Sequence, residues 1–573
     1  MILSDSIPRR WAPVWLAALT VLLLAPGSAT LPLIDRDEPR FAGATLEMME
    51  RGEWVVPYFN GVYRFDKPVL TYWLMRAGYA LAGRGEFGAR LHSMVCAFFV
   101  AWAVHAIGRR RFGDAAGFRA GVFTLFTAQM IVHGRSAVAD LPLLLFVTLA
   151  QGALWALLGP GAARPTPARG AALGVFLGMG FLAKGPLAIA IPALTLLLYR
   201  FAFWRRPLSW RVRDAGRLAG AAVLAFVAVV APWGLLALVR TRGAFWQVGI
   251  GRHVVDRGLA AFDGRPFVPF YYIPSSFFSL FPWIAFAGAA FAALRRRWSS
   301  DGAFLAAWFL APYLIFSFYS TQLPHYVLPA FPAFALILAQ AFETPSAEWP
   351  RWARVFSVAV LGLAAAVAIV PAAAGAALSG RPEWAPLRSA LFGVSALVAW
   401  LTAMGLLATA RRGLAWRALA AAPLLGLAVW QTGGALRGVT PAIEIARLTA
   451  PLPPETVFWC CRFREPSLVF YTGRRWSEGS PEEAARDASG PRPFFAVVTE
   501  REVRAGDFLA WFAATATGRP ATLRARDYAA ENAALPRGNI VGIVEGWNVA
   551  RSAWVRLAVI HRPAPEREAG AAP

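Results

Sequence analysis

The sequence predicts a polytopic α-helical membrane protein of about thirteen transmembrane helices, with a soluble α/β domain at its C-terminal end. Three observations lead to this fold class. Of the 573 residues, 57% are apolar and 16% are charged, whereas soluble domains carry about 25% charged residues. The mean hydropathy is positive, at +0.48. Apolar runs of about 20 residues, long enough to cross a bilayer, recur as far as Gly433. An ordinary soluble enzyme is therefore excluded.

Thirteen apolar runs are candidate spans. They are 11–34, 90–107, 119–133, 138–158, 171–184, 186–204, 217–240, 270–294, 303–319, 326–342, 354–378, 388–409 and 415–433. The first run follows Arg9 and Arg10 and contains a signal-peptide-like stretch at 26–29. Because the apolar run continues to Ile34, we expect an uncleaved signal anchor.

The arginines orient these spans. With the N-terminus inside, the clusters at 109–111, 205–206, 295–297 and 411–412 all fall on the inner side, as the positive-inside rule expects. The net charge of +24 is also explained without nucleic acid. The residues before Gly434 hold 39 basic and 18 acidic side chains, and the remainder holds 18 and 15. The odd number of spans places the C-terminal tail outside.

Two domains are expected. Residues 1–433 form the transmembrane domain, with long outer loops at 35–89 and 241–268, and residues 434–573 form the soluble domain. In the tail, the runs 456–459, 467–471, 494–499 and 540–544 predict strands, and 481–487 and 503–514 predict helices, which indicates an α/β domain. Three cysteines, two of them adjacent (Cys460 and Cys461), exclude a disulfide framework.

Polar residues collect at the outer ends of the spans, where they are costly and tend to be functional. The first loop opens with Asp35, Arg36, Asp37, Glu38, Pro39 and Arg40, and later contains Asp66 and Lys67. Span ends on the same side add His133, Arg135, Asp140, Lys184, His253, His325 and Tyr326. A solvated position explains most single charges of the loop, but it does not explain the grouping.

Lysine usage marks two of these positions. The chain has 57 basic residues, and only Lys67 and Lys184 are lysine. A solvated face accepts either basic residue, whereas a site that needs a compact point charge does not. We interpret both lysines as contacts to a phosphate oxygen; the alternative is a boundary lysine that snorkels to the interface.

Several of these segments resemble one family. The motifs DEPRFA (37–42), GEWVVP (52–57), the pair Asn60-Gly61 and FDKPVLTYW (65–73) resemble the first outer loop of bacterial glycosyltransferases of the protein-mannosyltransferase and aminoarabinose-transferase group, glycosyltransferase family 39. ADLP (139–142), FLAKGP (181–186) and LPHYVLP (323–329) resemble further motifs of the group. REPSLVFY (464–471) resembles the soluble domain of the aminoarabinose branch.

The resemblance implies a GT-C fold and a pentosyl- or hexosyltransferase of the bacterial inner membrane. Such an enzyme takes a sugar from a polyprenyl-phosphate carrier, usually undecaprenyl phosphate, and transfers it to lipid A, a glycan or a protein at the periplasmic face. Membrane lipids are further partners, and no nucleic acid is expected. The chain would then have a cytoplasmic N-terminus and a periplasmic C-terminal domain.

The resemblance also assigns roles to residues. The acidic residue that the family needs in the first loop matches Asp37, with Asp35 close enough to be confused with it, and Asp140 is a further catalytic candidate. Cations placed at the leaving phosphate would stabilise the transition state, and the candidates for this donor site are Arg40, Lys67, Lys184, Tyr326 and His325.

A divalent metal ion (Zn, Mg or Mn) is implied between Asp66 and His253. The family usually has Glu where Asp66 stands. No organic cofactor is expected.

Two other classes of function were weighed. A secondary transporter or lipid flippase would suit thirteen spans, but transporters tend to show internal repeats and charged residues near the middle of the membrane. Here the polar residues collect at one face instead. A receptor-like or scaffold role for the tail would leave the acidic and lysine-bearing first loop unexplained. The glycosyltransferase is therefore the preferred hypothesis.

Overall fold

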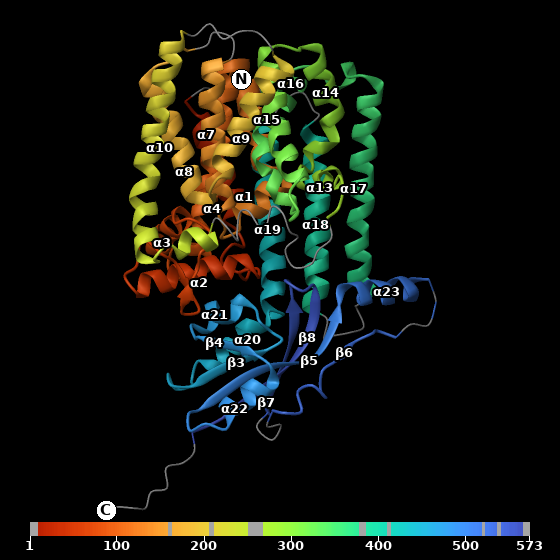
Figure 1. The fold of residues 1–573 in the computed structure, drawn as a ribbon. Helices are drawn as coiled ribbons and strands as arrows, with labels where there is room; N and C mark the ends of the chain where they lie inside the picture. Colours follow the sequence, from red (N-terminus) through yellow and green to blue (C-terminus); the bar gives the residue numbers. More distant parts are fainter. Residues whose placement is uncertain are drawn as a thin grey trace, which may run out of the picture.

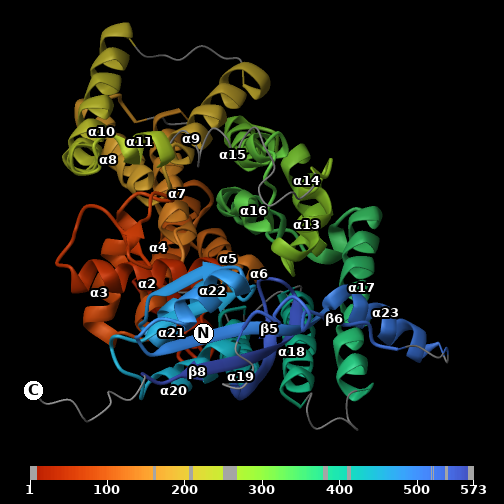
Figure 2. The ribbon, with the colours of Figure 1, turned by 60° about the horizontal axis from the view of Figure 1, so that its bottom comes forward.

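The computed structural model describes residues 10–158, 163–204, 211–249, 267–377, 385–408, 414–517, 519, 522–535 and 540–564. Within them, long helices form a bundle, and a smaller unit built on a β-sheet lies at one end of it (Figure 1). The described chain starts at the end of the bundle that is remote from the sheet (Figure 1). The second view shows the strands of this unit lying across the near end of the bundle (Figure 2).

The bundle is formed by helices that follow one another from the N-terminus. They are α1 (Ala12–Leu24), α4 (Glu86–Phe112), α5 (Asp114–Leu125), α6 (Ala128–Gly134), α7 (Asp140–Leu158), α8 (Pro167–Lys184), α9 (Leu187–Leu197), α10 (Val212–Arg240), α13 (Tyr272–Ser279), α14 (Ala287–Arg296), α15 (Ser300–Ser317), α16 (Phe331–Ala341), α17 (Arg351–Ala377), α18 (Ala385–Ala408) and α19 (Leu414–Gly438). A π-helix, Leu198–Phe203, continues α9, and a 3₁₀ helix, Pro324–Ala330, leads into α16. The short helix α11 (Ala244–Trp246) follows α10.

The outer helices of the bundle expose apolar side chains, as a helix in lipid does. On α10 the exposed fractions of Leu224 and Val239 are 72% and 77%. Six of the described helices are long and apolar enough to cross a membrane, or up to eight if each of two bent helix pairs is one span. The protein is therefore a multi-pass helical membrane protein, which is the predicted fold class at its coarser level.

The two bent pairs fall on two of the predicted spans. Helices α5 and α6, on the predicted span 119–133, are bent by 64°, and α13 and the helical segment Trp283–Arg296, on the predicted span 270–294, are bent by 111°. Pro282 stands at the second break, where a proline ends a helix because it lacks the N–H donor. The total of thirteen spans stays a prediction.

The first outer loop folds against the end of the bundle. Its helices are α2 (Asp37–Glu50), which lies across that end (Figure 1), and α3 (Leu70–Ala82). Between them runs a hairpin of β1 (Tyr58–Phe59) and β2 (Val62–Tyr63). Its two turn residues are Asn60 and Gly61, with φ of 55° and 84°. Asn-Gly is the preferred pair for such a turn because both residues tolerate positive φ.

The C-terminal unit contains a mixed sheet of strand order β4-β3-β5-β8-β7, with β6 paired to β5. The strands are β3 (Val457–Cys461), β4 (Trp476–Gly479), β5 (Phe494–Arg504), β6 (Arg526–Asp527), β7 (Ile540–Asn548) and β8 (Ala553–Arg562). Strand β3 is parallel to β4 and β5, whereas β5, β8 and β7 are antiparallel. The helices are α20 (Pro441–Thr449), α21 (Pro466–Thr472), α22 (Pro481–Ala488) and α23 (Ala505–Ala516).

One predicted strand of this unit is wrong. The run 467–471 is helical and belongs to α21, which begins at Pro466. Proline is favoured in the first turn of a helix, where its missing N–H would have no partner. The short run of apolar residues carried no period that could distinguish helix from strand. This correction matters because α21 faces α2 across the boundary between the two units (Figures 1 and 2).

The adjacent cysteines are free and buried. Both belong to β3, where successive side chains point to opposite faces of the sheet. Cys460 packs in one apolar cluster and Cys461 in another. They are core residues of the two faces.

Candidate active site

A cavity of about 590 Å³ opens where the first outer loop, several helix ends and the C-terminal unit meet. It is lined by nine of the ten residues that the sequence singled out, namely Asp35, Asp37, Arg40, Asp66, Lys67, Asp140, Lys184, His325 and Tyr326. The tenth, His253, lies outside the described residues. Segments more than 280 residues apart in the chain, from Asp35 to Tyr326, therefore contribute to one site.

The helix ends explain how these side chains converge. Asp37 is the first residue of α2 and Asp140 the first of α7, where a carboxylate is favoured by the helix dipole. Lys184 is the last residue of α8, where the dipole favours a cation. Arg40 lies three residues after Asp37, on the same face of α2. His325 and Tyr326 belong to the 3₁₀ helix before α16.

The cavity is rich in charge, with a small cationic excess. Its described lining includes five cationic side chains (Arg36, Arg40, Arg64, Lys67 and Lys184) and four carboxylates (Asp35, Asp37, Asp66 and Asp140). Both lysines of the chain are among them, as the lysine usage predicted. A concave site with such an excess attracts an anionic group.

Asp140 and Lys184 form an ion pair at the inner wall of this cavity. The Nζ atom of Lys184 lies 2.6 Å from Oδ1 of Asp140, and both side chains are about nine-tenths buried. Lys184 Nζ also lies 5.4 Å from the centre of the Tyr326 ring. A carboxylate that already binds an ammonium group is a weak proton acceptor. Asp140 therefore orients Lys184 toward the cavity.

Two histidines complete this cluster. His325 Nε2 lies 3.8 Å from Asp140 Oδ1, and the rings of His133 and His325 are 4.8 Å apart. Gln129 Nε2 donates to His133 Nδ1 at 2.9 Å. The possible ligand atoms of His133, Asp140 and His325 all lie within 4.8 Å of one another. Two imidazoles and one carboxylate form a donor set that suits zinc.

The predicted pair of lipid-phosphate and metal residues at 66–67 has a different surrounding. Asp66 Oδ2 lies 3.0 Å from Arg64 Nη1, and Arg64 Nε donates to the Tyr72 hydroxyl at 2.9 Å. The Nζ atom of Lys67 donates to the backbone oxygen of Asp66 at 3.0 Å. Sequence reasoning missed Arg64, a buried arginine that follows the hairpin and holds Asp66 in place.

Asp35 and Asp37 have contrasting environments. Asp35 accepts two hydrogen bonds from Ser467, from its backbone N–H to Oδ1 at 2.9 Å and from its hydroxyl to Oδ2 at 2.5 Å. Burial raises the pKa of Asp35 to about 7. Asp37 is exposed and lines the cavity. Within the part of the chain that the structure describes, its carboxylate has no hydrogen bond or ion pair, so it is available to a substrate.

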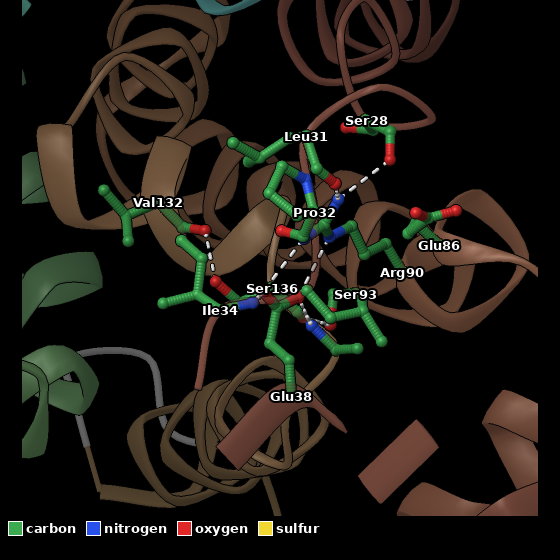
Figure 3. A network of polar contacts seen from close by, with 12 residues as sticks. Ser28, Leu31, Pro32, Ile34, Glu38, Glu86, Arg90, Ser93, Val132 and Ser136 are labelled. Carbon is green, nitrogen blue, oxygen red and sulfur yellow. Dashed lines mark hydrogen bonds and ion pairs between the residues drawn. The ribbon is translucent and has the colours of Figure 1, made fainter. Parts of the chain in front are cut away.

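A buried ion pair holds this end of α2. Arg90 of α4 donates from Nε and Nη2 to the two carboxylate oxygens of Glu38, each at 2.9 Å. The same guanidinium donates to the backbone oxygens of Ser28, Leu31 and Pro32. Figure 3 shows the two side chains turned toward each other among these backbone groups.

Glu38 also reaches the start of α7. It accepts from the backbone N–H of Ile34 at 2.8 Å and from that of Ala137 at 2.7 Å. Ala137 lies three residues before Asp140. One carboxylate thus joins the segments that carry Asp37 and Asp140. Sequence reasoning noted Glu38 within its motif, but it had no signal for the partner 52 residues away.

Comparison with known proteins identifies relatives of the chain. A family model described as dolichyl-phosphate-mannose-protein mannosyltransferase matches residues 66–233. The undecaprenyl phosphate-alpha-4-amino-4-deoxy-L-arabinose arabinosyl transferase of Edwardsiella ictaluri is 31% identical over 411 residues, 69% of this chain and 71% of that protein. A Pseudomonas aeruginosa protein of the same name is 33% identical over 315 residues, 53% of this chain and 55% of that protein.

The extent of the match varies among relatives. Two Pseudomonas fluorescens transferases of this name are 30% and 31% identical, and the matches span 58% and 63% of their lengths. Among solved structures, that of ArnT from Cupriavidus metallidurans bound to undecaprenyl phosphate superposes with a TM-score of 0.71. It is 20% identical, with 97% of this chain and 98% of that chain covered. This likeness shows a shared fold over nearly the whole chain.

Proposed function

Because the chain belongs to the family of undecaprenyl phosphate-alpha-4-amino-4-deoxy-L-arabinose arabinosyl transferases, we propose that it is a membrane glycosyltransferase that uses a sugar linked to undecaprenyl phosphate. Aminoarabinose is the sugar that the relatives' names indicate, and lipid A is the acceptor implied by the aminoarabinose branch. The observation that carries the proposal is the exposed carboxylate of Asp37 in a cavity that also contains Arg40, Lys67 and Lys184.

These residues divide the chemistry between them. Arg40, Lys67 and Lys184 bind the phosphate of the donor. The bond between the anomeric carbon and the phosphate oxygen breaks, and undecaprenyl phosphate leaves with the electron pair. Preplaced cations stabilise the charge that develops on this leaving group. The acceptor oxygen forms the new bond to the anomeric carbon. Asp37 accepts the acceptor's proton or stabilises the positive charge of the sugar.

The proposal includes a topology. Thirteen spans place the N-terminus in the cytoplasm and the C-terminal unit in the periplasm of the bacterial inner membrane, with the transmembrane catalytic domain at 1–433 and the periplasmic domain at 434–573. The long periplasmic loops are then 35–89 and 241–268. The excess of arginine on the inner side supports this orientation.

A fusion at the C-terminus tests the orientation. Alkaline phosphatase joined after Arg567 should be active, because this enzyme matures only outside the cytoplasm, and a fluorescent protein that matures in the cytoplasm should stay dark at the same position. The reverse pattern would place the C-terminal unit on the side away from the periplasm and would mean that the number of spans is wrong by one.

A divalent ion is part of the proposal, and two donor sets are available for it. One is Asp66 with His253, as the resemblance implies, and the other is His133, Asp140 and His325. The ion would share the negative charge of the donor phosphate. In each set the described carboxylate is paired with a cation, Asp66 with Arg64 and Asp140 with Lys184. We therefore expect the ion to bind tightly only when a phosphate adds its negative charge.

Metal content distinguishes the two sets. Protein purified and dialysed without lipid is expected to hold little zinc, and addition of undecaprenyl phosphate should raise the zinc bound at equilibrium toward one ion per chain. His325→Ala should abolish this uptake if the His133, Asp140 and His325 set binds the ion. Asp66→Asn should abolish it if the other set does. Equal uptake with and without the lipid would contradict the dependence on phosphate.

Replacing Lys67 by arginine is expected to lower kcat/KM by about 10- to 100-fold, although the charge is kept. The larger planar guanidinium cannot take the place of a compact ammonium group in a fitted site. The matched control is Arg447→Lys, the reverse exchange at an exposed position of α20, which should leave transfer unchanged. Full activity of Lys67→Arg would remove the support that lysine usage gives to the phosphate contact.

The function itself can be tested in cells. In a bacterium that makes the undecaprenyl phosphate-linked aminoarabinose donor but lacks its own transferase, expression of this chain should add aminoarabinose to lipid A, as mass spectrometry of the lipid shows. Expression of Asp37→Asn at the same level is the control. Unmodified lipid A, with a verified donor pool, would contradict the proposed acceptor or the proposed sugar.

A further inference from the structure

The C-terminal unit contacts the segment that leads into Asp37, and these contacts are polar and buried. Ser467 of α21 binds the carboxylate of Asp35 through both its backbone N–H and its hydroxyl. The exposed fraction of Ser467 is 1%. Asp35 is two residues before Asp37 and 432 residues before Ser467. Both oxygens of Asp35 are therefore used to hold the chain, which separates its role from that of Asp37.

A second contact fixes the residue between these two acids. Glu465 is buried, and its Oε2 atom lies 3.9 Å from Nε of Arg36. The position of Glu465 is in turn set within its own unit. Its Oε1 atom accepts from Asn548 Nδ2 at 3.0 Å and lies 3.4 Å from Nε of Arg551. Ala550, next to Arg551, lines the cavity itself.

Further contacts flank this segment on both sides. The Tyr471 hydroxyl accepts from the backbone N–H of Leu33 at 2.8 Å and donates to Glu86 at 3.3 Å. In the hairpin, the Asn60 side chain pairs with the backbone of Trp476, donating to its oxygen at 2.8 Å and accepting from its N–H at 2.9 Å. The first outer loop is thus bound by α21 and β4 at several points around the cavity.

The segment needs such support because it has no regular structure of its own. Residues 32–34 form neither helix nor strand, and residues 35–36 form a turn before α2 begins. An unsupported turn samples several backbone conformations, and holding it in one conformation costs entropy. A reacting group that is misplaced by about 1 Å can cost 10²-fold in rate.

We infer that Ser467 and Glu465 of the C-terminal unit are positioning residues, which hold Asp35 and Arg36 so that Asp37 points into the cavity. The inference rests on the proposed function, in which Asp37 acts on the substrate. It makes the C-terminal unit a structural part of the active site, although it contributes no catalytic side chain. Neither residue touches the sugar or the phosphate, so their effect is on rate rather than on binding of the donor.

The test compares Ser467→Ala with Ser467→Thr in the full-length protein in nanodiscs. Ser467→Ala is expected to lower kcat by about 10- to 100-fold, with KM for the undecaprenyl phosphate-linked donor changed by less than about threefold and with the midpoint of thermal unfolding nearly unchanged. Ser467→Thr keeps the hydroxyl and should restore kcat. Ser489→Ala, at an exposed serine of the same unit, is the matched control and should resemble the wild type.

Hydrogen–deuterium exchange gives a readout that does not depend on turnover. Amides of residues 33–37 are expected to exchange at least about 10-fold faster in Ser467→Ala than in the wild type or in Ser489→Ala, because local opening becomes easier. Unchanged exchange, or unchanged kcat in an active enzyme, would overturn the positioning role. If the wild type transfers no sugar at all, the proposed function fails, and the exchange rates alone still decide whether Ser467 orders this segment.

Discussion

Asp37→Asn is expected to lower sugar transfer by about 10³-fold or more while the protein stays folded and inserted in the membrane. General acid–base catalysis by one side chain typically contributes 10²- to 10⁴-fold, and asparagine can neither take a proton nor stabilise a developing positive charge. The exposed carboxylate has no hydrogen bond or ion pair among the described residues that the substitution could break. Stability should therefore change little.

The matched control for this variant is Glu50→Gln, at an exposed carboxylate of the same helix. It should retain wild-type transfer. Transfer, binding of undecaprenyl phosphate and thermal unfolding are measured on both proteins. We expect Asp37→Asn to bind the lipid and to unfold like the wild type. Near-wild-type transfer by Asp37→Asn would move the catalytic role to Asp35 or Asp140.

The second large effect is on stability. Glu38→Ala is expected to lower the free energy of unfolding by about 3–5 kcal/mol, because breaking a buried ion pair leaves an uncompensated charge. Arg90, which is fully buried, would keep its three backbone acceptors but lose both carboxylate oxygens. The backbone N–H groups of Ile34 and Ala137 would also lose their acceptor.

Denaturant titration in mixed micelles measures this loss. Glu50→Ala on the same helix has no buried partner to leave behind and should change the free energy of unfolding by less than about 0.5 kcal/mol. A loss below about 1 kcal/mol for Glu38→Ala would mean that the segments before α2 and α7 are held mainly by apolar packing rather than by the Glu38–Arg90 pair.

The residues of the cavity could be predicted from sequence to an unusual degree, because they sit in long motifs at helix ends. Lys67 and Lys184 stood out in a chain that otherwise uses arginine, and both line the cavity. Residue type, however, says little about pairing. Only the fold brings Lys184 within 2.6 Å of Asp140 or His133 near His325, since these residues come from separate helices.

The contacts between the two units could not be predicted for the same reason. Ser467 lay in a short apolar run that predicted a strand, and a run of five residues is too short to show the period of a helix. Its bond to Asp35 spans 432 positions of the chain. Likewise, composition reveals apolar runs but not the bends of 64° and 111° that divide two of them, because such bends depend on how neighbouring helices pack.

The central claim is the transfer of a sugar from an undecaprenyl phosphate carrier at the cavity around Asp37. The most direct measurement incubates the purified protein with lipid A and a panel of undecaprenyl phosphate-linked sugars, each carrying a radioactive label, beside Asp37→Asn. We predict labelled lipid A with the aminoarabinose donor, little or none with the other sugars, and a rate about 10³-fold lower for the variant. Absence of transfer from every donor by a folded wild-type protein that binds undecaprenyl phosphate would contradict the account, and so would equal transfer by the variant.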